Sequence, residues 1–307
     1  MVTILGAGGA IGNELLKELI TRNETVRLVS RSPKVVPGAA EVVAADLSNL
    51  NDTVKAVSGS RIVYLLAGLK YDLKVWRALW PSIMRNAIEA AKRANARLVF
   101  FDNVYMYGRV DGVMTEETPF NPCSRKGEVR AEIATFLLKE IQGGNLTALI
   151  ARSADFYGPF ARTGIPNVLV FDKLTRGSKA NWLANDTVKH SFTFTPDAAR
   201  SLVLLADSES AWNQTWHVPT ASAPLTGKQF IELVARESGA QPKYRVLTRP
   251  MLRVAGLFDT TVRELHEMLY QYEFDYLFDS TKFNKAFLYE PFSYVEGVRR
   301  TAQAYRQ

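Results

Sequence analysis

The stretch MVTILGAGGAIGNELLKEL, residues 1–19, decides how the rest of the chain is interpreted. A short apolar run precedes three glycines at three-residue steps, and leucines at helical spacing follow them. Glycines between a strand and a helix permit a tight turn, let the backbone approach a phosphate, and let the helix pack close to the strand. The free N–H groups at the start of such a helix favour an anion. We therefore expect the pyrophosphate of a dinucleotide to bind here, against Gly6, Gly8, Gly9, Ala10, Ile11 and Gly12.

The end of the second predicted strand indicates which dinucleotide to expect. About 20 residues after the loop, an Asp or Glu would bind a free ribose 2′-hydroxyl. This chain has Ser30 and Arg31 there, and a cation suits a 2′-phosphate, so the sequence favours NADP(H) over NAD(H). In the alternative, Arg31 stacks on the adenine or is solvated. Asp46 and Leu47 follow the third predicted strand and are placed to contact the adenine, although Asp46 fits a helix cap equally well.

Strands and helices alternate over the first half of the chain. This alternation implies right-handed crossovers and a doubly wound parallel α/β sheet, the Rossmann fold. The expected strands are residues 2–5, 25–30, 41–45, 61–66, 97–101 and 147–151, and the clearest helices are residues 11–21, 72–93 and 127–141. Pro81 is expected to kink or divide its helix. The apolar stripes of the helices at 72–93 and 127–141 suit core packing or, alternatively, a homodimer contact.

The second half of the chain is less regular and predicts a smaller C-terminal lobe. A Gly-, Pro- and Arg/Lys-rich insertion is followed later by short helices, one capped by Thr226 and ending near Gly239, and a last one opened by Pro291. We expect this lobe to bind the substrate and to close over the reactive end of the cofactor. The predicted domains are a Rossmann domain of residues 1–158 and 182–219, and a substrate-binding lobe of residues 159–181 and 220–307.

Composition narrows the possible partners and the location. The net charge of +7 comes from scattered Lys and Arg residues, which indicates a solvated surface with a local phosphate site rather than a nucleic-acid interface. No run approaches the ~20 apolar residues of a membrane span. The first residues lack the segments of a secretion signal, and the single Cys123 cannot form an internal disulfide. We therefore expect a cytoplasmic protein with a small-molecule substrate, and with neither nucleic acid nor membrane as a partner.

The three histidines do not suggest a metal site. His190, His217 and His266 are widely spaced and lack the close partners of a zinc site, so no metal is expected. His190 is a candidate for the wall of the cleft. The charged run at residues 263–267 predicts a helix with solvent-exposed charge pairs.

These features together resemble the extended short-chain dehydrogenase/reductase superfamily, in its NAD-dependent epimerase/dehydratase group, over nearly the whole chain. Members carry the glycine loop, an Asp after the third strand, a small-residue turn after the fourth and a V-Y-G-like turn after the fifth. The last two correspond here to Leu66-Ala67-Gly68 and Met106-Tyr107-Gly108. The sequence RSADFYGP, residues 152–159, looks like the family's R-x-x-x-x-Y-G-P segment, which lines the nicotinamide end. The resemblance therefore adds these cofactor contacts: Leu66, Ala67, Gly68 and Tyr157.

The chain departs from the family where the chemistry is done. The family uses a Ser or Thr together with a Tyr and a Lys in the pattern Y-x-x-x-K, in which the Tyr moves a proton. Here Asn103 stands at the Ser/Thr position, Ser124 at the Tyr position and Glu128 at the Lys position, and Y-x-x-x-K occurs nowhere in the chain. The candidate replacements are Asn103, Tyr105, Ser124 and Lys126. In the alternative, Tyr105 and Tyr107 pack in the core and Lys126 is solvated.

Two functions remain open from the sequence. The first is an NADP(H)-dependent oxidoreductase or epimerase/dehydratase-like enzyme with a non-standard acid/base set. Its substrate would be a small carbonyl, an alcohol or a sugar, as the resemblance implies. The second is a catalytically inactive NADP(H)-binding redox sensor or regulatory protein, suggested by the missing Tyr–Lys pair. The full-length C-terminal lobe favours the enzyme.

Overall fold

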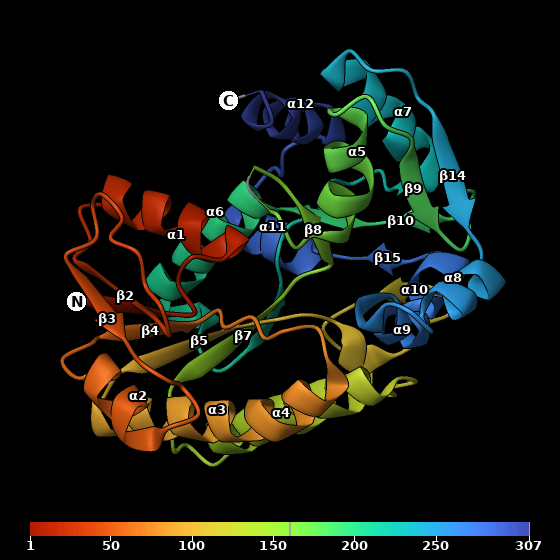
Figure 1. The fold of residues 1–307 in the computed structure, drawn as a ribbon. Helices are drawn as coiled ribbons and strands as arrows, with labels where there is room; N and C mark the ends of the chain where they lie inside the picture. Colours follow the sequence, from red (N-terminus) through yellow and green to blue (C-terminus); the bar gives the residue numbers. More distant parts are fainter. Residues whose placement is uncertain (160, 307) are drawn as a thin grey trace.

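A computed structural model describes residues 1–159 and 161–306 of the chain (Figure 1). Seven parallel strands form the central sheet in the order β12-β7-β5-β4-β1-β2-β3. Their bounds are β1 Val2–Leu5, β2 Val26–Ser30, β3 Glu41–Ala44, β4 Ile62–Leu65, β5 Arg97–Asp102, β7 Ala148–Arg152 and β12 Thr215–His217. The strand order reverses direction beside β1, and parallel sheets bind ligands at the carboxyl ends of the strands at such a point. The predicted doubly wound Rossmann sheet is confirmed.

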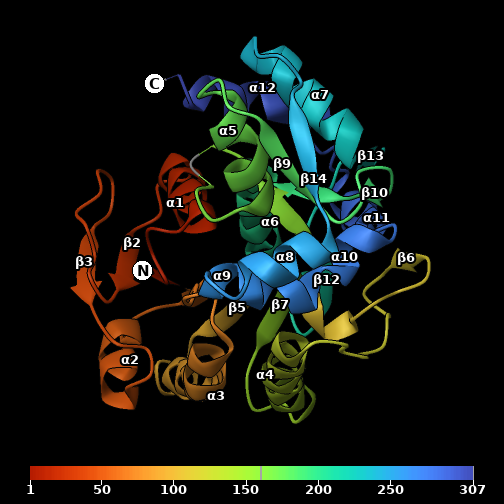
Figure 2. The ribbon, with the colours of Figure 1, turned by 45° about the vertical axis from the view of Figure 1, so that its right-hand side comes forward.

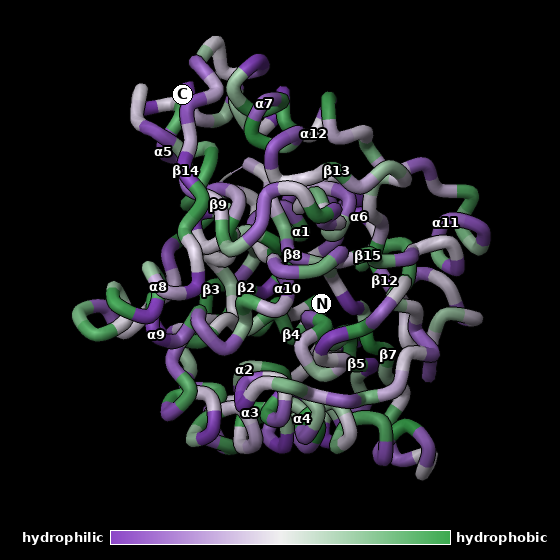
Figure 3. The backbone as a smooth tube through the Cα atoms, turned by 90° about the vertical axis from the view of Figure 1, so that its right-hand side faces the viewer, coloured by the Kyte–Doolittle hydropathy of each residue, from purple (hydrophilic) through white to green (hydrophobic). Residues whose placement is uncertain are grey.

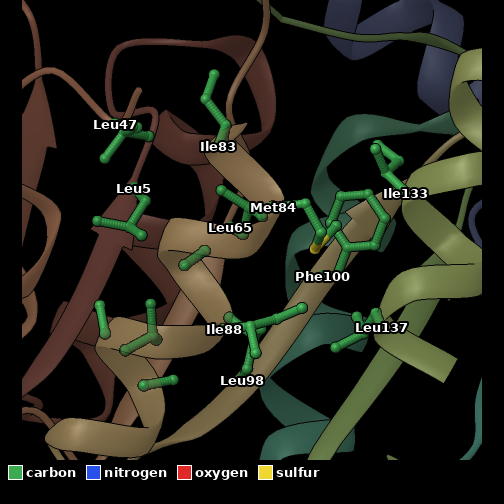
Figure 4. Close-up of a cluster of buried hydrophobic side chains, with 14 of the residues drawn as sticks. Leu5, Leu47, Leu65, Ile83, Met84, Ile88, Leu98, Phe100, Ile133 and Leu137 are labelled. Atoms are coloured by element: carbon green, nitrogen blue, oxygen red, sulfur yellow. The ribbon is translucent and has the colours of Figure 1, made fainter. Parts of the chain in front are cut away.

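Two helical layers cover the sheet. Figure 1 shows α2, α3 and α4 on one face and α1 and α6 on the other. Their bounds are α1 Ala10–Thr21, α2 Leu50–Val57, α3 Leu73–Arg93, α4 Arg125–Gln142 and α6 Thr195–Asp207. Figure 4 shows Ile83, Met84 and Ile88 of α3 packed against strand residues such as Leu65 and Leu98. The apolar stripe of α3 is thus a core face, as is that of α4.

Pro81 does not divide its helix. The helix α3 continues from Leu73 to Arg93 with the proline inside it. Proline removes one backbone hydrogen bond and crowds the preceding turn. Buried residues on both sides of it, among them Trp80 and Met84, hold the two halves of α3 against the same sheet. The prediction of a divided helix is therefore wrong, because tertiary packing outweighs the local cost.

The second lobe has a core of aromatic side chains. Its strands are β6 Val113–Met114, β8 Asp155–Tyr157, β9 Ala180–Leu183, β10 Lys189–His190, β11 Phe192–Phe194, β13 Leu225–Thr226, β14 Tyr244–Leu247 and β15 Leu277–Phe278. Its helices are α5 Asp172–Leu174, α7 Gly227–Ser238, α8 Arg249–Ala255, α9 Thr260–Leu265, α10 Tyr270–Glu273, α11 Thr281–Phe287 and α12 Tyr294–Ala304. Trp182, Phe192 and Phe230 are buried together here. Pairing of β9 with β14 and of β11 with β8 keeps these strands out of the seven-stranded sheet.

The domain division stays a prediction, but its boundary at residue 182 is not where the packing changes. Trp182 and Phe192, which the sequence groups with the Rossmann domain, belong to the aromatic core of the lobe. Helix α6 and strand β12, further along the same segment, return to the central sheet and its helical layer. Residues 160 and 307 of the predicted lobe lie outside the described residues.

The ends of the lobe's helices follow capping chemistry. Thr226 and Gln229 form a capping box at the start of α7, and Gly239 ends that helix with φ 70°, as predicted. The last helix, α12, begins at Tyr294, where the Ser293 hydroxyl accepts a hydrogen bond from the Glu296 N–H at 3.3 Å. The prediction that Pro291 opens this helix is wrong because the serine side chain supplies the cap.

Helices α8, α9 and α10 lie between the rest of the lobe and the sheet (Figure 2). The turn between α8 and α9 is coloured hydrophobic in Figure 3, and its Leu257 and Phe258 are exposed.

Within the described part of the chain, no helix combines the length and apolar character needed to cross a bilayer.

The turn after β1 is fixed by both neighbouring strands. The N–H groups of Gly6 and Ala7 both donate to the Val29 carbonyl of β2, at 2.9 and 3.0 Å. Gly6 has φ 94°, and a Cβ built on it would lie 2.5 Å from the Cα of Ala67, in the turn after β4. A side chain at Gly6 would therefore meet backbone that cannot move aside.

Gly6→Ala should lower the free energy of unfolding by about 2–4 kcal/mol, because it adds an overpacking clash to a left-handed backbone. Gly59→Ala is the matched control, since Gly59 has φ 74° with no atom within 4 Å of its built Cβ. It should cost only the backbone term, about 1–2 kcal/mol. Urea unfolding measures both variants. Equal losses would show that the contact with Ala67 carries no cost.

Candidate functional site

The start of α1 is an open anion site. Gly9 is the N-cap residue and offers no side chain to cap the helix, and the first turn carries no acidic residue. The first backbone hydrogen bond of the helix joins the Asn13 N–H to the Gly9 carbonyl at 3.0 Å. The preceding N–H groups, those of Ala10, Ile11 and Gly12, therefore stay available to a phosphate. This geometry fits the pyrophosphate predicted for the loop.

The close approach in this loop lies at its first glycine. A Cβ at Gly12 would meet only ordinary contacts, the nearest 3.6 Å away at the Gly6 carbonyl. Packing of α1 on β1 therefore does not require a glycine at position 12. The turn Leu66-Ala67-Gly68 follows β4 beside the loop, and the Leu66 N–H donates to the Leu5 carbonyl at 2.8 Å. The residues predicted around the pyrophosphate are thus brought together at one edge of the sheet.

Arg31 and Asp46 meet where β2 and β3 end. Both side chains are exposed. Hydrogen bonds from the Ser48 N–H and hydroxyl, at 2.9 and 2.8 Å, and the charge of Arg31 hold the pKa of Asp46 below its usual value. The cap of α2 is Asn49, so Asp46 does not cap that helix. The Leu47 side chain is buried in the core, and its backbone carbonyl accepts a hydrogen bond from the Asn86 side chain. A contact between Leu47 and the adenine stays a prediction.

Asn103 and Ser124 are engaged in local turns. The Asn103 side-chain oxygen accepts a hydrogen bond from the Tyr105 N–H at 3.1 Å, at the start of a short 3-10 helix, η1 (Tyr105–Tyr107). The Ser124 hydroxyl caps α4 by accepting from the Gly127 N–H at 3.0 Å. The Tyr105 ring stacks on Trp76 with the centroids 6.2 Å apart, and burial raises the pKa of its hydroxyl. Their part in catalysis stays a prediction.

Lys126 is fully buried rather than solvated. Its Nζ donates to a carboxylate oxygen of Glu267 at 2.8 Å and to the carboxylate of Glu264, and lies 4.6 Å from the Tyr71 ring centroid. The alternative that Lys126 is solvated is therefore wrong. The expectation of exposed charge pairs at residues 263–267 is also wrong, because the Glu264 and Glu267 side chains are only 16% and 20% exposed. Arg125 also pairs with Glu267, at 3.7 Å, so the two cations and the two carboxylates of this cluster balance.

Two of the family-like tyrosines are core residues. Tyr107 is buried, and its hydroxyl accepts from the Arg152 guanidinium at 2.7 Å and lies 2.9 Å from His217 Nε2. Burial raises the pKa of Tyr107 to about 12 despite Arg152, and lowers the pKa of His217 to about 3. Both groups are therefore neutral near pH 7. Tyr157 is stacked on Phe171 in the aromatic core of the lobe, and its contact with a cofactor stays a prediction.

Asp155 is a site residue that sequence reasoning missed. It stands at the start of β8, inside the quoted RSADFYGP segment. Its Oδ2 accepts from the Tyr272 hydroxyl at 2.7 Å and lies 3.2 Å from His190 Nε2. His190 itself is buried and stacked on Tyr272 and Tyr276. Asp155 is therefore the more solvent-exposed residue of the pair. The available signal was a carboxylate in a segment that otherwise matches the family pattern.

Tyr270 was also missed. It comes from α10 of the lobe, and its buried hydroxyl lies close to the Ser124 side chain. Burial raises its pKa most, and the nearby Cys123, Tyr105 and Asp155 raise it further. Only the tertiary fold brings Tyr270 to the residues around Ser124. Among residues 1–159 and 161–306, no group of three or more His, Cys, Asp or Glu side chains could hold a metal ion.

Lys126→Met should lower the free energy of unfolding by about 2–3 kcal/mol, because it leaves the partly buried Glu264 carboxylate without a cation, while Glu267 keeps Arg125. Lys228→Met removes a lysine from an exposed pair with Glu232, at 4.0 Å, and should cost less than about 1 kcal/mol. Urea unfolding gives both values, and hydrogen exchange should show faster opening of α9 in the Lys126 variant. Equal stability of the two variants would contradict a structural role for the buried cluster.

The comparisons with known proteins agree with this geometry. A 3-diazoavenalumate denitrifying reductase from Streptomyces sp is 25% identical over 276 residues, which cover 84% of this chain and 88% of the relative. Two solved structures share the fold. A double mutant of a dTDP-glucose 4,6-dehydratase from Streptomyces venezuelae has a TM-score of 0.82 at 17% identity, covering 100% of this chain and 97% of the other. A UDP-glucuronic acid 4-epimerase from Bacillus cereus has a TM-score of 0.83 at 15% identity, covering 100% and 99%.

The family model matches the Rossmann part of the chain. It is described as the NAD dependent epimerase/dehydratase family and covers residues 2–218. Together with the open glycine loop, it supports a nicotinamide dinucleotide as the cofactor. Because the match extends from the first strand of the central sheet to the last, the chain belongs to the NAD dependent epimerase/dehydratase family, within the extended short-chain dehydrogenases/reductases that it resembles in sequence.

Proposed function

We propose that this protein is an NADP(H)-dependent reductase whose small electrophilic acceptor needs no proton from a Tyr–Lys pair. One observation carries the proposal: the cofactor loop is open, whereas the positions of the proton-moving pair hold a helix cap and an acid. Ser124 caps α4, and Glu128 is exposed on the same helix. Lys126, the nearest replacement cation, is neutralised by Glu264 and Glu267.

The missing acid limits which acceptors are feasible. When bound, the nicotinamide supplies a hydride. A ketone that accepts a hydride becomes an alkoxide and needs a proton from a positioned acid. In this site the pKa of Tyr105 is raised by burial, and no Lys of the Y-x-x-x-K pattern lowers it. An acceptor that is already a cation becomes neutral on reduction and needs no proton.

The relative's name supports such an acceptor. It is a denitrifying reductase whose substrate name contains a diazo group. An aryldiazonium ion that accepts a hydride loses N2 and becomes the arene, with one dinucleotide oxidised and no proton consumed. The solved neighbours are a dehydratase and an epimerase of nucleotide sugars. Removing water from a sugar, or inverting one of its alcohol carbons, moves protons and so requires a positioned acid and base. This chain lacks the family's Tyr–Lys pair, so we favour reduction over nucleotide-sugar chemistry.

Deuterium transfer tests this function. The protein is incubated with NADPH deuterated at C4, on either face, and with benzenediazonium, acetophenone or UDP-glucose. We expect deuterium in benzene above the rate without protein, and none in 1-phenylethanol or the sugar. Turnover of the ketone or sugar would contradict the proposal. No transfer to any acceptor, with unequal affinities for NADP+ and NADPH, would instead support the non-catalytic redox sensor.

Arg31→Ala should raise the dissociation constant of NADPH about tenfold, equivalent to about 1.4 kcal/mol, because it removes a charge-assisted contact to the 2′-phosphate. The dissociation constant of NADH should change less than about twofold. Lys34→Ala removes another exposed cation three residues along and should leave both constants unchanged. Fluorescence titration measures the constants. Equal losses for the two dinucleotides would contradict the NADP(H) preference.

The same proposal includes a cytoplasmic location and a homodimer formed through α3 and α4. A groove on the outward face of α4, lined by residues such as Glu132, Thr135 and Phe136, supports the dimer. Phe136 is an exposed aromatic side chain there, with the Arg85 guanidinium 5.5 Å from its ring.

A further inference from the structure

We propose that Asp155 and the tyrosines around it bind the positively charged aromatic end of the acceptor. This inference rests on the proposed reductase function and names its substrate class. The Asp155 side chain is 13% exposed, and its contacts with Tyr272 and His190 both involve one carboxylate oxygen, Oδ2. In the part of the chain that the structure describes, no Lys or Arg forms an ion pair with it. A carboxylate this far from water without a strong cation partner is expected to bind one.

Aromatic rings surround this carboxylate. The charge of Asp155 adds to burial in raising the pKa of Tyr105, Tyr270 and Tyr276, which come from η1, α10 and the segment after α10. The hydroxyls of Tyr270 and Tyr276 are buried, the first close to the Ser124 side chain and the second close to the Asp155 backbone. Tyr276 is 6% exposed, so its hydroxyl faces the interior. Neutral tyrosine rings around a carboxylate form the kind of cage that binds organic cations.

The neighbouring charged groups balance one another. Lys126, the buried cation of α4, and Arg125 pair with Glu264 and Glu267. Asp155 has no such Lys or Arg partner among the described residues. Burial strengthens the attraction of Asp155 for a cation, because the local dielectric constant is lower than in water.

The Asp155 side chain is partly open to solvent, with 13% of it exposed. A small hollow of about 10 Å³ is lined by Tyr270, Tyr276, Phe274 and Arg109, among others, and Asp155 does not line it. Arg109 is paired with Asp111 and covers the Phe274 ring at 3.6 Å, so its charge is partly compensated. A nucleoside diphosphate, with its negative charges, would be repelled by Asp155.

Matched probe ligands test this inference without any turnover. Phenyltrimethylammonium and its neutral isostere tert-butylbenzene are titrated into the full-length protein with NADP+ present, and binding is followed through tryptophan fluorescence. We expect the unaltered protein to bind the cation at least about tenfold more tightly than the isostere. Equal binding of the two probes would overturn the inference, even if deuterium transfer from NADPH persists.

Asp155→Asn removes the charge while its amide oxygen can still accept from Tyr272. It should raise the dissociation constant of phenyltrimethylammonium about tenfold and change that of tert-butylbenzene less than twofold. Asp186→Asn is the matched control, because Asp186 accepts from the Tyr244 hydroxyl at 2.6 Å in a similar pair at another place. It should change neither constant. The same loss in both variants, or an equal loss for both probes, would overturn the inference. Selective cation binding by an unaltered protein that transfers no deuterium would count against the proposed function alone.

Discussion

The contact between two backbone turns underlies both the fold and the cofactor site. Gly6, in a left-handed conformation, lies directly against Ala67 in the turn after β4, and the Val29 carbonyl of β2 holds the same turn from the other side. No side chain fits between them. The chain must therefore leave β1 at one angle, which aims the uncapped start of α1 at the carboxyl edge of the sheet. The order of the strands and the glycine at position 6 therefore together create the anion site at the start of α1.

The fold was largely predictable because its strands are apolar on nearly every residue and alternate with amphipathic helices. The strands of the first half occur where these patterns place them, to within a residue or two at their ends. The errors have local physical causes. Pro81 is tolerated because α3 is packed along its length, and Ser293 displaces Pro291 as the start of the last helix. The pairing of β11 with β8 was not foreseeable, since pairing between small sheets depends on tertiary contacts.

The cofactor loop was predictable from the sequence, but the surroundings of Lys126 and Asp155 were not. The difference lies in how far apart along the chain the contributing residues are. The cofactor loop lies within one strand–turn–helix unit, so its chemistry can be read locally. The charge around Lys126 depends on Glu264 and Glu267, some 140 residues later in the chain. The sequence alone predicted that these two residues form solvent-exposed charge pairs. Asp155 lies inside the family-like segment at residues 152–159. Its place in the site became apparent only from the structure, which brings Tyr270, Tyr272 and Tyr276 near it. Residues that act across lobes leave no periodic signal.

In the reaction that we propose, the hydride is transferred without a proton donor. Single-turnover kinetics of the NADPH-bound protein with an aryldiazonium acceptor, followed by loss of NADPH absorbance between pH 5.5 and 8, test this most directly. After subtraction of the rate without protein, we expect a rate of hydride transfer that does not change with pH and that is the same in H2O and D2O. A rate that falls tenfold per pH unit, or one several-fold slower in D2O, would show that a proton moves with the hydride and would contradict transfer without a proton donor.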